Sequence, residues 1–172
     1  VSGRHFPDEL QGMLLSGRFK SRSVIRYDFI DSGSGYGATV LEPLMSSKHP
    51  NFRPVDVKMG PDGAAYVADW YNPIINHGAH DFRDPRRDVD HGRIWRITAK
   101  DRPLTQVPNL GAMATGELVT QLGSKENWVR HQSKLLLSER SRGEVASVLD
   151  EWVAGLNPKE ADYDHKLLEA LW

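Results

Sequence analysis

One stretch of the sequence, residues 76–91, concentrates side-chain types that bind ligands and carry out catalysis; it reads NHGAHDFRDPRRDVDH. Imidazole and carboxylate groups together could bind a metal ion, with Asp84 and Asp88 as candidate ligands. Arg86 and Arg87 could instead hold a carboxylate, on a quinone cofactor or an acidic sugar, through bidentate hydrogen bonds. The stretch therefore indicates a metal site or a ligand site, although its spacing matches no standard metal-binding pattern such as His-Glu-x-x-His.

Proton transfer is a third chemistry open to the same stretch. A His or an Asp could act as general base on a sugar hydroxyl, and His77, His80 and Asp88 are the candidates. The competing interpretation is structural, because a loop rich in Arg and Asp is often an internal salt-bridge network that only holds the loop in shape. The whole loop runs from Tyr71 to Asp90; loops of that length inside a compact domain are usually functional or disordered, and its aromatic and apolar residues, such as Tyr71, Ile74 and Phe82, favour an ordered loop.

The strands that position this loop belong to a weak internal repeat. Residues 12–17 followed by 24–28 share their pattern with residues 64–69 followed by 94–98. Each copy predicts a pair of short strands.

Additional strands extend both copies. Residues 55–59 alternate apolar and polar side chains, which predicts a half-buried leading strand, and Gly60-Pro61-Asp62-Gly63 predicts a tight hairpin turn after it. Residues 38–41 predict an outer strand for the first copy. Short strands at this spacing are typical of propeller blades with four strands each. We therefore expect residues 1–100 to form about two antiparallel blades of a partial β-propeller.

The order of strands in a blade brings two loops together. The loop between the second and third strands opens at the same end as the loop that leads into the next blade, so residues 76–91 should lie near residues 47–51. We expect the functional end to comprise residues 47–53 and 69–91, which adds Arg53 to the ligand-binding candidates. The histidines grouped in this way are His49, His77, His80 and His91.

The residues around the end of the predicted strand 64–69 offer another binding surface. The segment Asp69-Trp70-Tyr71-Asn72-Pro73 could contribute a carboxylate and an aromatic platform for a sugar ring. Trp and Tyr at a strand end more often pack a blade interface. Asp69, Trp70 and Asn72 are therefore candidates for ligand binding, with packing as the alternative.

The second part of the chain has a helical periodicity. Residues 101–113, punctuated by Pro and Gly, predict a linker. The apolar residues between Val145 and Leu156 have the spacing of an amphipathic helix that Asn157-Pro158 would stop. Ser124 is placed to cap an earlier helix. Stacked short helices favour a solenoid, so we expect residues 114–172 to be the start of an all-α helical repeat.

Composition excludes several classes of function. The chain has 22 Lys and Arg against 23 Asp and Glu, a net charge of -1, which argues against nucleic acid as a partner. No apolar run approaches the roughly 20 residues of a membrane span. The absence of cysteine excludes disulfides, thiolate nucleophiles and covalent haem attachment within this chain.

Three long motifs carry a resemblance to a known family. They are residues 52–63 (FRPVDVKMGPDG), residues 66–75 (YVADWYNPII) and residues 91–97 (HGRIWRI). In these motifs the chain resembles the planctomycete-type membrane-bound dehydrogenases. Those are large exported proteins with a propeller like that of glucose/sorbosone dehydrogenases, followed by HEAT-like repeats and a C-terminal c-type haem domain. The resemblance covers residues 1 to about 100.

The helical part resembles HEAT repeats less specifically. The resemblance lies in Val129-Arg130, followed by the small Ser133 and then Leu136-Leu137, which is the spacing of the inner helix in such repeats. Together the two resemblances imply that the chain is a fragment of a larger exported protein of the periplasm or cell envelope. Its partners would be the remaining propeller blades and the haem domain.

The resemblance also implies a function. The chain would be part of a quinoprotein-like dehydrogenase acting on the CH–OH groups of sugars or alcohols, inactive by itself. Pyrroloquinoline quinone and calcium would be its cofactors, with the c-type haem elsewhere in the full-length protein. The alternative is a non-catalytic scaffold of propeller and solenoid that binds carbohydrate or protein.

Overall fold

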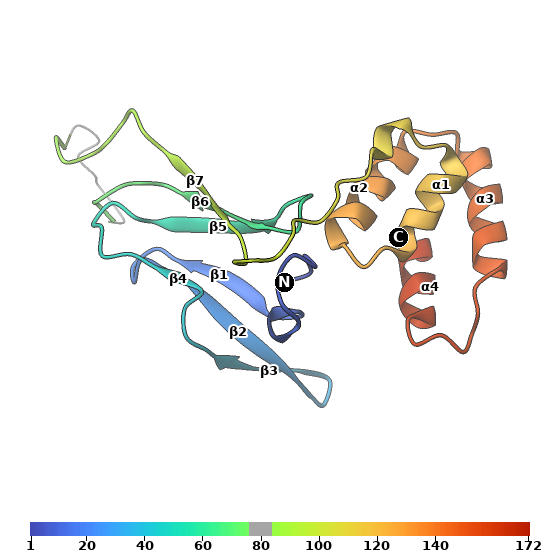
Figure 1. Cartoon of the computed structure of the whole chain (residues 1–172), viewed down its shortest axis with the longest axis horizontal. Coiled ribbons are helices and arrows are strands. Elements are labelled where there is room, and N and C mark those ends of the chain that lie inside the picture. The colour runs from blue at the N-terminus through green and yellow to red at the C-terminus, as the bar shows by residue number, and fades with distance from the viewer. Residues whose placement is uncertain (76–83) are drawn as a thin grey trace. The chain divides into compact units, whose positions relative to one another are not determined.

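A computed structural model describes residues 1–75 and 84–172 of the chain. The fold is mixed: antiparallel β-sheets come first along the chain and α-helices follow (Figure 1). The chain divides into two compact units, residues 3–104 and residues 105–172. Each unit has a hydrophobic core of its own.

The first sheet of the β unit is built around a long central strand. Strand β2 (Ser23–Ser32) pairs with β1 (Leu14–Arg18) on one side and with β3 (Gly35–Val40) and the short β4 (Met45–Ser46) on the other. All of these pairings are antiparallel, with Leu14 opposite Tyr27 in the first of them.

Strands β3 and β4 form one interrupted outer strand rather than two separate ones. Between them the backbone N–H of Leu41 donates to the Arg26 carbonyl at 2.9 Å, and that of Leu44 donates to the Val24 carbonyl at 2.8 Å. Pro43 lies between these two hydrogen bonds and has no N–H to contribute. The outer strand predicted at residues 38–41 is therefore longer than expected and broken once by a proline.

The second sheet is a meander of β5 (Pro54–Met59), β6 (Ala65–Asp69) and β7 (Arg93–Ile97). Residues 60–64 join β5 to β6 in the tight turn predicted from the sequence, and Gly63 has a positive φ of 76° there. Three strands make up this sheet among the described residues, where the blade pattern predicted four. The described residues thus form two open sheets and no closed propeller.

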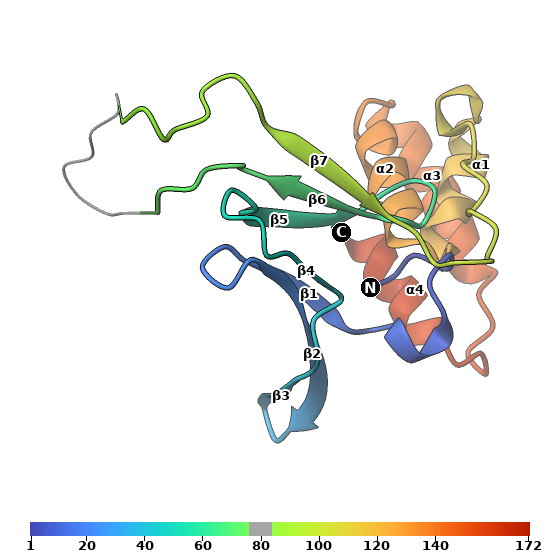
Figure 2. The same ribbon diagram turned by 60° about the vertical axis from the view of Figure 1, so that its left-hand side comes forward.

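The two sheets contact each other through β1 and β5, which lie side by side in Figures 1 and 2. Gly17 of β1 lies at the contact: a Cβ atom on it would be 2.5 Å from the Pro54 carbonyl oxygen. Only a residue without a side chain permits this approach. The core of the unit collects Phe6, Leu10 and Ala65, with Leu15, Val57 and Ile97 packed against them.

Residues near the start of the chain close the β unit against the segment after β7. The His5 ring is buried; its Nδ1 lies 2.8 Å from the Pro103 carbonyl oxygen, and its Nε2 accepts the backbone N–H of Ala99 at 2.8 Å. The Arg102 guanidinium donates to the His5 carbonyl oxygen at 2.9 Å. Nδ1 of His5 is therefore the protonated nitrogen, because Nε2 accepts a hydrogen bond.

The helical unit contains α1 (Thr115–Thr120), α2 (Asn127–Ser138), α3 (Arg142–Ala154) and α4 (Tyr163–Leu171). Short 3₁₀ turns, Leu110–Ala112 and Gln121–Gly123, precede and follow α1. The buried core is apolar and comes from α1, α2 and both turns: Leu110, Leu118, Val119, Leu122, Val129 and Leu137. Trp128, Leu136, Val148 and Trp152 pack against it and are partly buried.

Two helix ends differ from the predicted ones. Ser124 does not cap α2; its hydroxyl accepts the backbone N–H of Glu126 at 3.2 Å in the turn before the helix. Helix α3 ends at Ala154, ahead of the predicted stop at Asn157-Pro158, and Gly155 is its C-cap residue. None of the helices in the described parts of the chain is long and apolar enough to cross a membrane.

Candidate functional site

Two segments predicted to form the functional end of the sheets are tied together by Asp69. Its carboxylate is buried (3% exposed) and accepts three hydrogen bonds from different places in the chain. Oδ1 accepts the backbone N–H of Arg53 at 2.7 Å and that of Tyr71 at 3.0 Å, while Oδ2 accepts the indole N–H of Trp95 at 3.0 Å. The backbone N–H of Trp70 also donates to the Arg53 carbonyl at 2.9 Å. Asp69 therefore holds the loops in place through hydrogen bonds made inside the β unit.

Arg53 spans the gap between the two sheets. Its side chain donates to the carbonyl oxygens of Phe19 at 3.3 Å, Phe52 at 3.2 Å and Pro73 at 3.2 Å. Burial, followed by the nearby positive charge of Arg22, lowers the pKa of Arg53, and the charge of Asp69 acts in the opposite direction. The loops before β2 and after β6 are thus joined through one buried guanidinium.

Two aromatic rings and one guanidinium group stack at the same end of the sheets. The His49 ring lies on the Tyr71 ring with centroids 5.6 Å apart and an interplanar angle of 20°. The Arg93 guanidinium lies over the Tyr71 ring, 3.7 Å from its centroid. Tyr71 has a φ of 52°, a strained value for a residue with a side chain, and such outliers cluster at ligand sites. Beside it Trp70 is 50% exposed, so an aromatic surface is open to a ligand here.

Asn72 plays a structural part in this region. Its side chain is buried, and its Oδ1 accepts the backbone N–H of Ile74 at 3.0 Å. This is an Asx turn, which shapes the loop locally.

The described part of the long loop, residues 84–92, contains two local ion pairs. Arg86 donates to both carboxylate oxygens of Asp84, with Nη2 and Oδ2 2.6 Å apart, and this lowers the pKa of Asp84 to about 2. The backbone N–H of Arg87 donates to the Asp84 carbonyl at 2.9 Å. Arg86 is therefore engaged inside the loop, as the structural interpretation of this stretch expects.

Asp88 and His91 form the second pair. Nδ1 of His91 lies 2.9 Å and 3.0 Å from the two carboxylate oxygens of Asp88, and Oδ1 also accepts the backbone N–H groups of Asp90 and His91. The hydrogen bond from His91 lowers the pKa of Asp88. The carboxylate fixes the imidazole with Nδ1 protonated, so that Nε2 of an exposed ring is free to accept a proton.

Two further candidates, His77 and His80, lie outside the described residues, as does their expected grouping with His49. Within residues 1–75 and 84–172 no group of three His, Asp or Glu side chains could hold a metal ion. Asp84 and Asp88, the candidate ligands, are each held by a neighbour in the loop. The described residues therefore contain a local Asp–His pair and, separately, the stack of His49, Tyr71 and Arg93, and no cation cage.

Two contributors were not singled out as site residues by the sequence. The guanidinium of Arg93 stacks on Tyr71. Trp95 donates to Asp69 across the sheet. Both lie on β7. They reach Asp69, the last residue of β6, and Tyr71 just after it because β6 and β7 are paired, with Asp69 opposite Arg93. No local spacing in the sequence reports such a contact.

Comparison with known proteins places the β unit in a family. A domain described only as a domain of unknown function, DUF7133, matches residues 1–101. The chain belongs to the DUF7133 family. No curated protein and no solved structure matches it. Both sheets and every site residue described above lie within the DUF7133 match.

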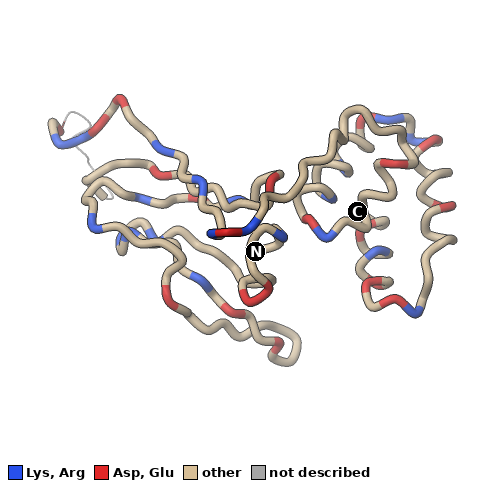
Figure 3. The backbone as a smooth tube through the Cα atoms, in the orientation of Figure 1, with Lys and Arg blue, Asp and Glu red and all other residues tan. Residues whose placement is uncertain are grey.

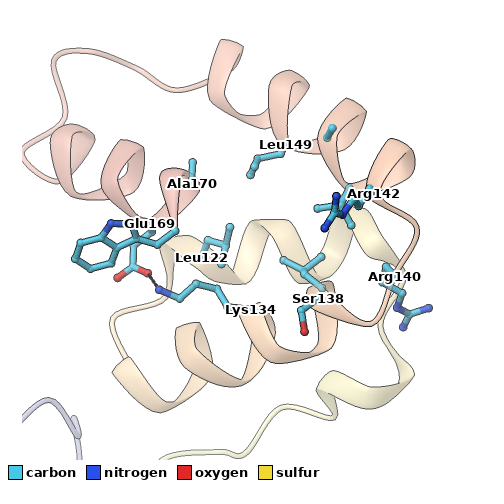
Figure 4. A pocket seen from close by; sticks show the side chains of 12 residues that line it. Leu122, Lys134, Ser138, Arg140, Arg142, Leu149, Glu169 and Ala170 are labelled. Atoms are coloured by element: carbon cyan, nitrogen blue, oxygen red, sulfur yellow. Dashed lines mark hydrogen bonds and ion pairs between the residues drawn. The ribbon is translucent and has the colours of Figure 1, made fainter.

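The helical unit, beyond the DUF7133 match, contains a hollow of about 550 Å³ between its helices (Figure 4). The lining combines apolar side chains such as Leu149 with the basic residues Lys134, Arg140 and Arg142. Its one carboxylate, Glu169, is already paired with Lys134 at 2.7 Å. No imidazole lines the hollow, so the chemistry of the DUF7133 loops has no counterpart there.

Proposed function

We propose that this chain is part of an exported β-propeller protein of the sugar-dehydrogenase-like type, and that its loop end binds a sugar or alcohol. The observation that carries the proposal is the pairing of Asp88 with His91 in the loop that leads into β7, two residues before Arg93, whose guanidinium lies over the Tyr71 ring. An imidazole held by a carboxylate is suited to accept a hydroxyl proton. The two sheets, in contact through β1 and β5, support an arrangement of neighbouring blades.

The residues divide the task in a simple way. Trp70, half exposed, offers a face on which a sugar ring can pack, and the stack of His49, Tyr71 and Arg93 holds the loop after β6. Nε2 of His91 takes the proton of the hydroxyl group that is oxidised, and Asp88 holds the ring and stabilises the imidazolium that forms. Asp88 is thus a positioning residue and His91 the base.

Alcohol oxidation also needs an acceptor for two electrons. Pyrroloquinoline quinone would supply it, and a c-type haem domain of the full-length protein would receive the electrons onward. Among the described residues no three acidic side chains gather where calcium could bind, and Asp84 and Asp88 are each paired with a neighbour, so no step here is assigned to calcium. The proposal assigns to this chain the substrate surface and the base.

A non-catalytic scaffold that binds carbohydrate or protein is the second candidate. It is favoured by the number of polar candidates that serve the fold: Asp69, Asn72, Arg53 and Arg86 all spend their hydrogen bonds on neighbouring segments. The helical unit, proposed as the start of a HEAT-like repeat, would then provide a second docking surface.

The test is turnover by the full-length protein. Sugars and alcohols are assayed with an artificial electron acceptor, with and without added pyrroloquinoline quinone and calcium. His91→Gln should lower kcat about a hundredfold or more without changing the melting temperature, and Asp88→Asn should lower it less. His131→Gln, an exposed histidine on α2, is the matched control and should leave turnover unchanged. Sugar binding without turnover under any condition would overturn the dehydrogenase in favour of the scaffold.

A further inference from the structure

Two arginines at the loop end have buried nitrogen atoms with no partner among the described residues. Arg53 is 7% exposed, and its Nε makes no hydrogen bond although its Nη atoms donate to carbonyl oxygens. Nε of Arg22, in the turn between β1 and β2, is likewise buried without a partner. Buried donors in proteins are almost always satisfied, so two such groups close together require an explanation.

The positive charges of these arginines reinforce each other. Arg22 acts on Arg53 as a like charge, and the opposing carboxylate, Asp69, already accepts three N–H groups. A buried cation without an ion-pair partner is costly, because desolvation is not offset by attraction. A bound anion would supply the missing partner.

The two chain segments that contain Arg22 and Arg53 have no acidic residue. Residues 10–27 and residues 43–55 contain no Asp or Glu, yet they carry several basic side chains: Arg18, Lys20, Arg22, Arg26, Lys48 and Arg53. The two segments meet at the loop end, where the backbone N–H of Ser47 donates to the Arg22 carbonyl at 3.0 Å. The tube coloured by charge in Figure 3 shows acidic residues elsewhere in the β unit, including the loop before β7. The field at this point is therefore positive although the chain is nearly neutral.

We propose that Arg22, with Arg53 behind it, binds an oxyanion group of a carbohydrate ligand, either a carboxylate or a sulfate ester. The planar guanidinium fork of Arg22 matches such a group, and Arg22 is the more exposed of the two. Arg53 stays on its carbonyl oxygens and contributes charge. The inference rests on the proposed function only in placing the ligand at the loop end; it concerns binding and requires no oxidation.

The experiment measures binding to the full-length protein by calorimetry and by thermal shift, with no electron acceptor present. The probes are galacturonate, galactose 6-sulfate, neutral galactose and inorganic sulfate, all at equal ionic strength. At least one acidic sugar should bind about tenfold or more tightly than galactose. The stronger of the two acidic sugars identifies the oxyanion as carboxylate or sulfate.

Two variants separate the site from its surroundings. Arg22→Gln should reduce the preference for the acidic sugar at least about tenfold, and without ligand it should melt no lower than the wild type, because a repulsion is removed. Since Arg22 has a φ of 55°, Gln carries the same backbone strain. Arg26→Gln is the matched control on β2: it removes one charge of the same field, but Arg26 donates to the Glu42 carbonyl, so binding should fall far less than in Arg22→Gln. If Arg22→Gln fails to fold, Arg22→Lys keeps the charge without the fork and should also bind more weakly.

Several outcomes would overturn the inference. Equal affinity for galacturonate, galactose 6-sulfate and galactose would do so, as would an Arg22 variant with unchanged affinity or an equal loss in Arg26→Gln. Binding of inorganic sulfate as tight as that of galactose 6-sulfate, with none of galacturonate, would reduce the site to a free-ion site. Turnover with no preference for acidic ligands would remove this inference and leave the proposed function intact. Binding of an acidic sugar without turnover would leave this inference intact and remove the dehydrogenase function.

Discussion

Asp69 is a buried carboxylate whose partners are all neutral N–H groups. Two of them are backbone amides and the third is an indole, and they belong to the loop before β5, the residues after β6, and β7. A single side chain can fix three segments in this way because an ionised carboxylate accepts several hydrogen bonds at once. The repeat pattern predicts the strand that ends at Asp69. The partners of its carboxylate come from other segments, so the sequence around Asp69 does not predict them.

Removal of this carboxylate should destabilise the β unit strongly. Asp69→Ala leaves three donors without an acceptor, each of which costs about 1–3 kcal/mol when buried; because the Trp95 ring is 37% exposed and can turn to water, we expect a loss of at least about 3 kcal/mol in the free energy of unfolding. Chemical denaturation provides the measurement. Asp56→Ala, an exposed Asp on β5, is the control and should change stability by less than about 0.5 kcal/mol. Similar stabilities for the two variants would refute the role assigned to Asp69.

Gly17 provides a second test at the level of one residue. Gly17→Ala would place a Cβ atom 2.5 Å from the backbone oxygen of Pro54, and neither strand can give way without moving its sheet. We expect a loss of about 1–3 kcal/mol, measured by thermal or chemical denaturation. Gly35→Ala on β3 has open space around it and should be neutral or slightly stabilising. A neutral Gly17→Ala would mean that β1 and β5 are not in close contact.

Part of the candidate site is foreseeable from local spacing and part is not. Asp84 with Arg86, and Asp88 with His91, are close in sequence, and these local ion pairs are what the structural interpretation of an Arg/Asp-rich loop implies. The contacts of Arg93 and Trp95 cross the sheet, so they depend on strand register. The role proposed for Arg22 depends on which loops meet, and no spacing in the sequence reports that meeting.

At the scale of elements, periodicity was informative about strands and helices and less so about their ends. Alternation indicated β5 because one face of that strand packs against the core. The outer strand of the first sheet runs past its predicted end because its pairing with β2 resumes beyond Pro43. The residue pattern along one strand does not show where another strand pairs with it. Helix α3 ends at Ala154, before Gly155, a residue of low helix propensity.

Glu169 couples α2 and α4, and this coupling depends on pH. Its buried carboxylate accepts Arg130 Nε at 2.8 Å and Lys134 Nζ at 2.7 Å. Burial by itself raises the pKa of Glu169, but the hydrogen bonds from Lys134 and Arg130 outweigh it and hold the pKa below its usual value of 4.5. The stabilisation is therefore fully present above pH 4.5 and is lost as the pH falls through the lower pKa of the folded state.

The melting temperature of the helical unit should consequently be lower in acid than at neutral pH. Circular dichroism at a series of pH values provides the measurement. Glu169→Gln should cost about 1–3 kcal/mol at neutral pH and should flatten the acid dependence, because the neutral amide does not titrate. Glu160→Gln removes an exposed ion pair with Lys166 and should cost less than about 1 kcal/mol. An unchanged acid dependence in Glu169→Gln would assign that dependence to other groups.

At the scale of the whole chain, each unit buries its own apolar residues and the β unit leaves others uncovered. The cores of the two units share no residue. Strands β3 and β7 are edges among the described strands, each paired on one side only. Exposed apolar side chains lie on or beside these edges: Phe29 (46% exposed), Ile30 (56%), Tyr36 (77%), Val40 (54%) and Ile94 (77%). Such surfaces and edges favour association with another sheet, which is the role proposed for the remaining propeller blades.

Residues 1–172 produced alone should therefore self-associate and bind a hydrophobic dye, whereas a full-length protein with further blades should do neither. Light scattering after size exclusion, together with dye fluorescence, provides the measurement. Because a charge on an edge strand opposes pairing, Tyr36→Lys on β3 and Ile94→Lys on β7 should each reduce self-association. Val89→Lys, which also replaces an exposed apolar residue but lies in the loop before β7, should have little effect. A monomeric, dye-silent and cooperatively folded 172-residue chain would show that these edges need no cover, and would contradict the proposal that other blades pack against them.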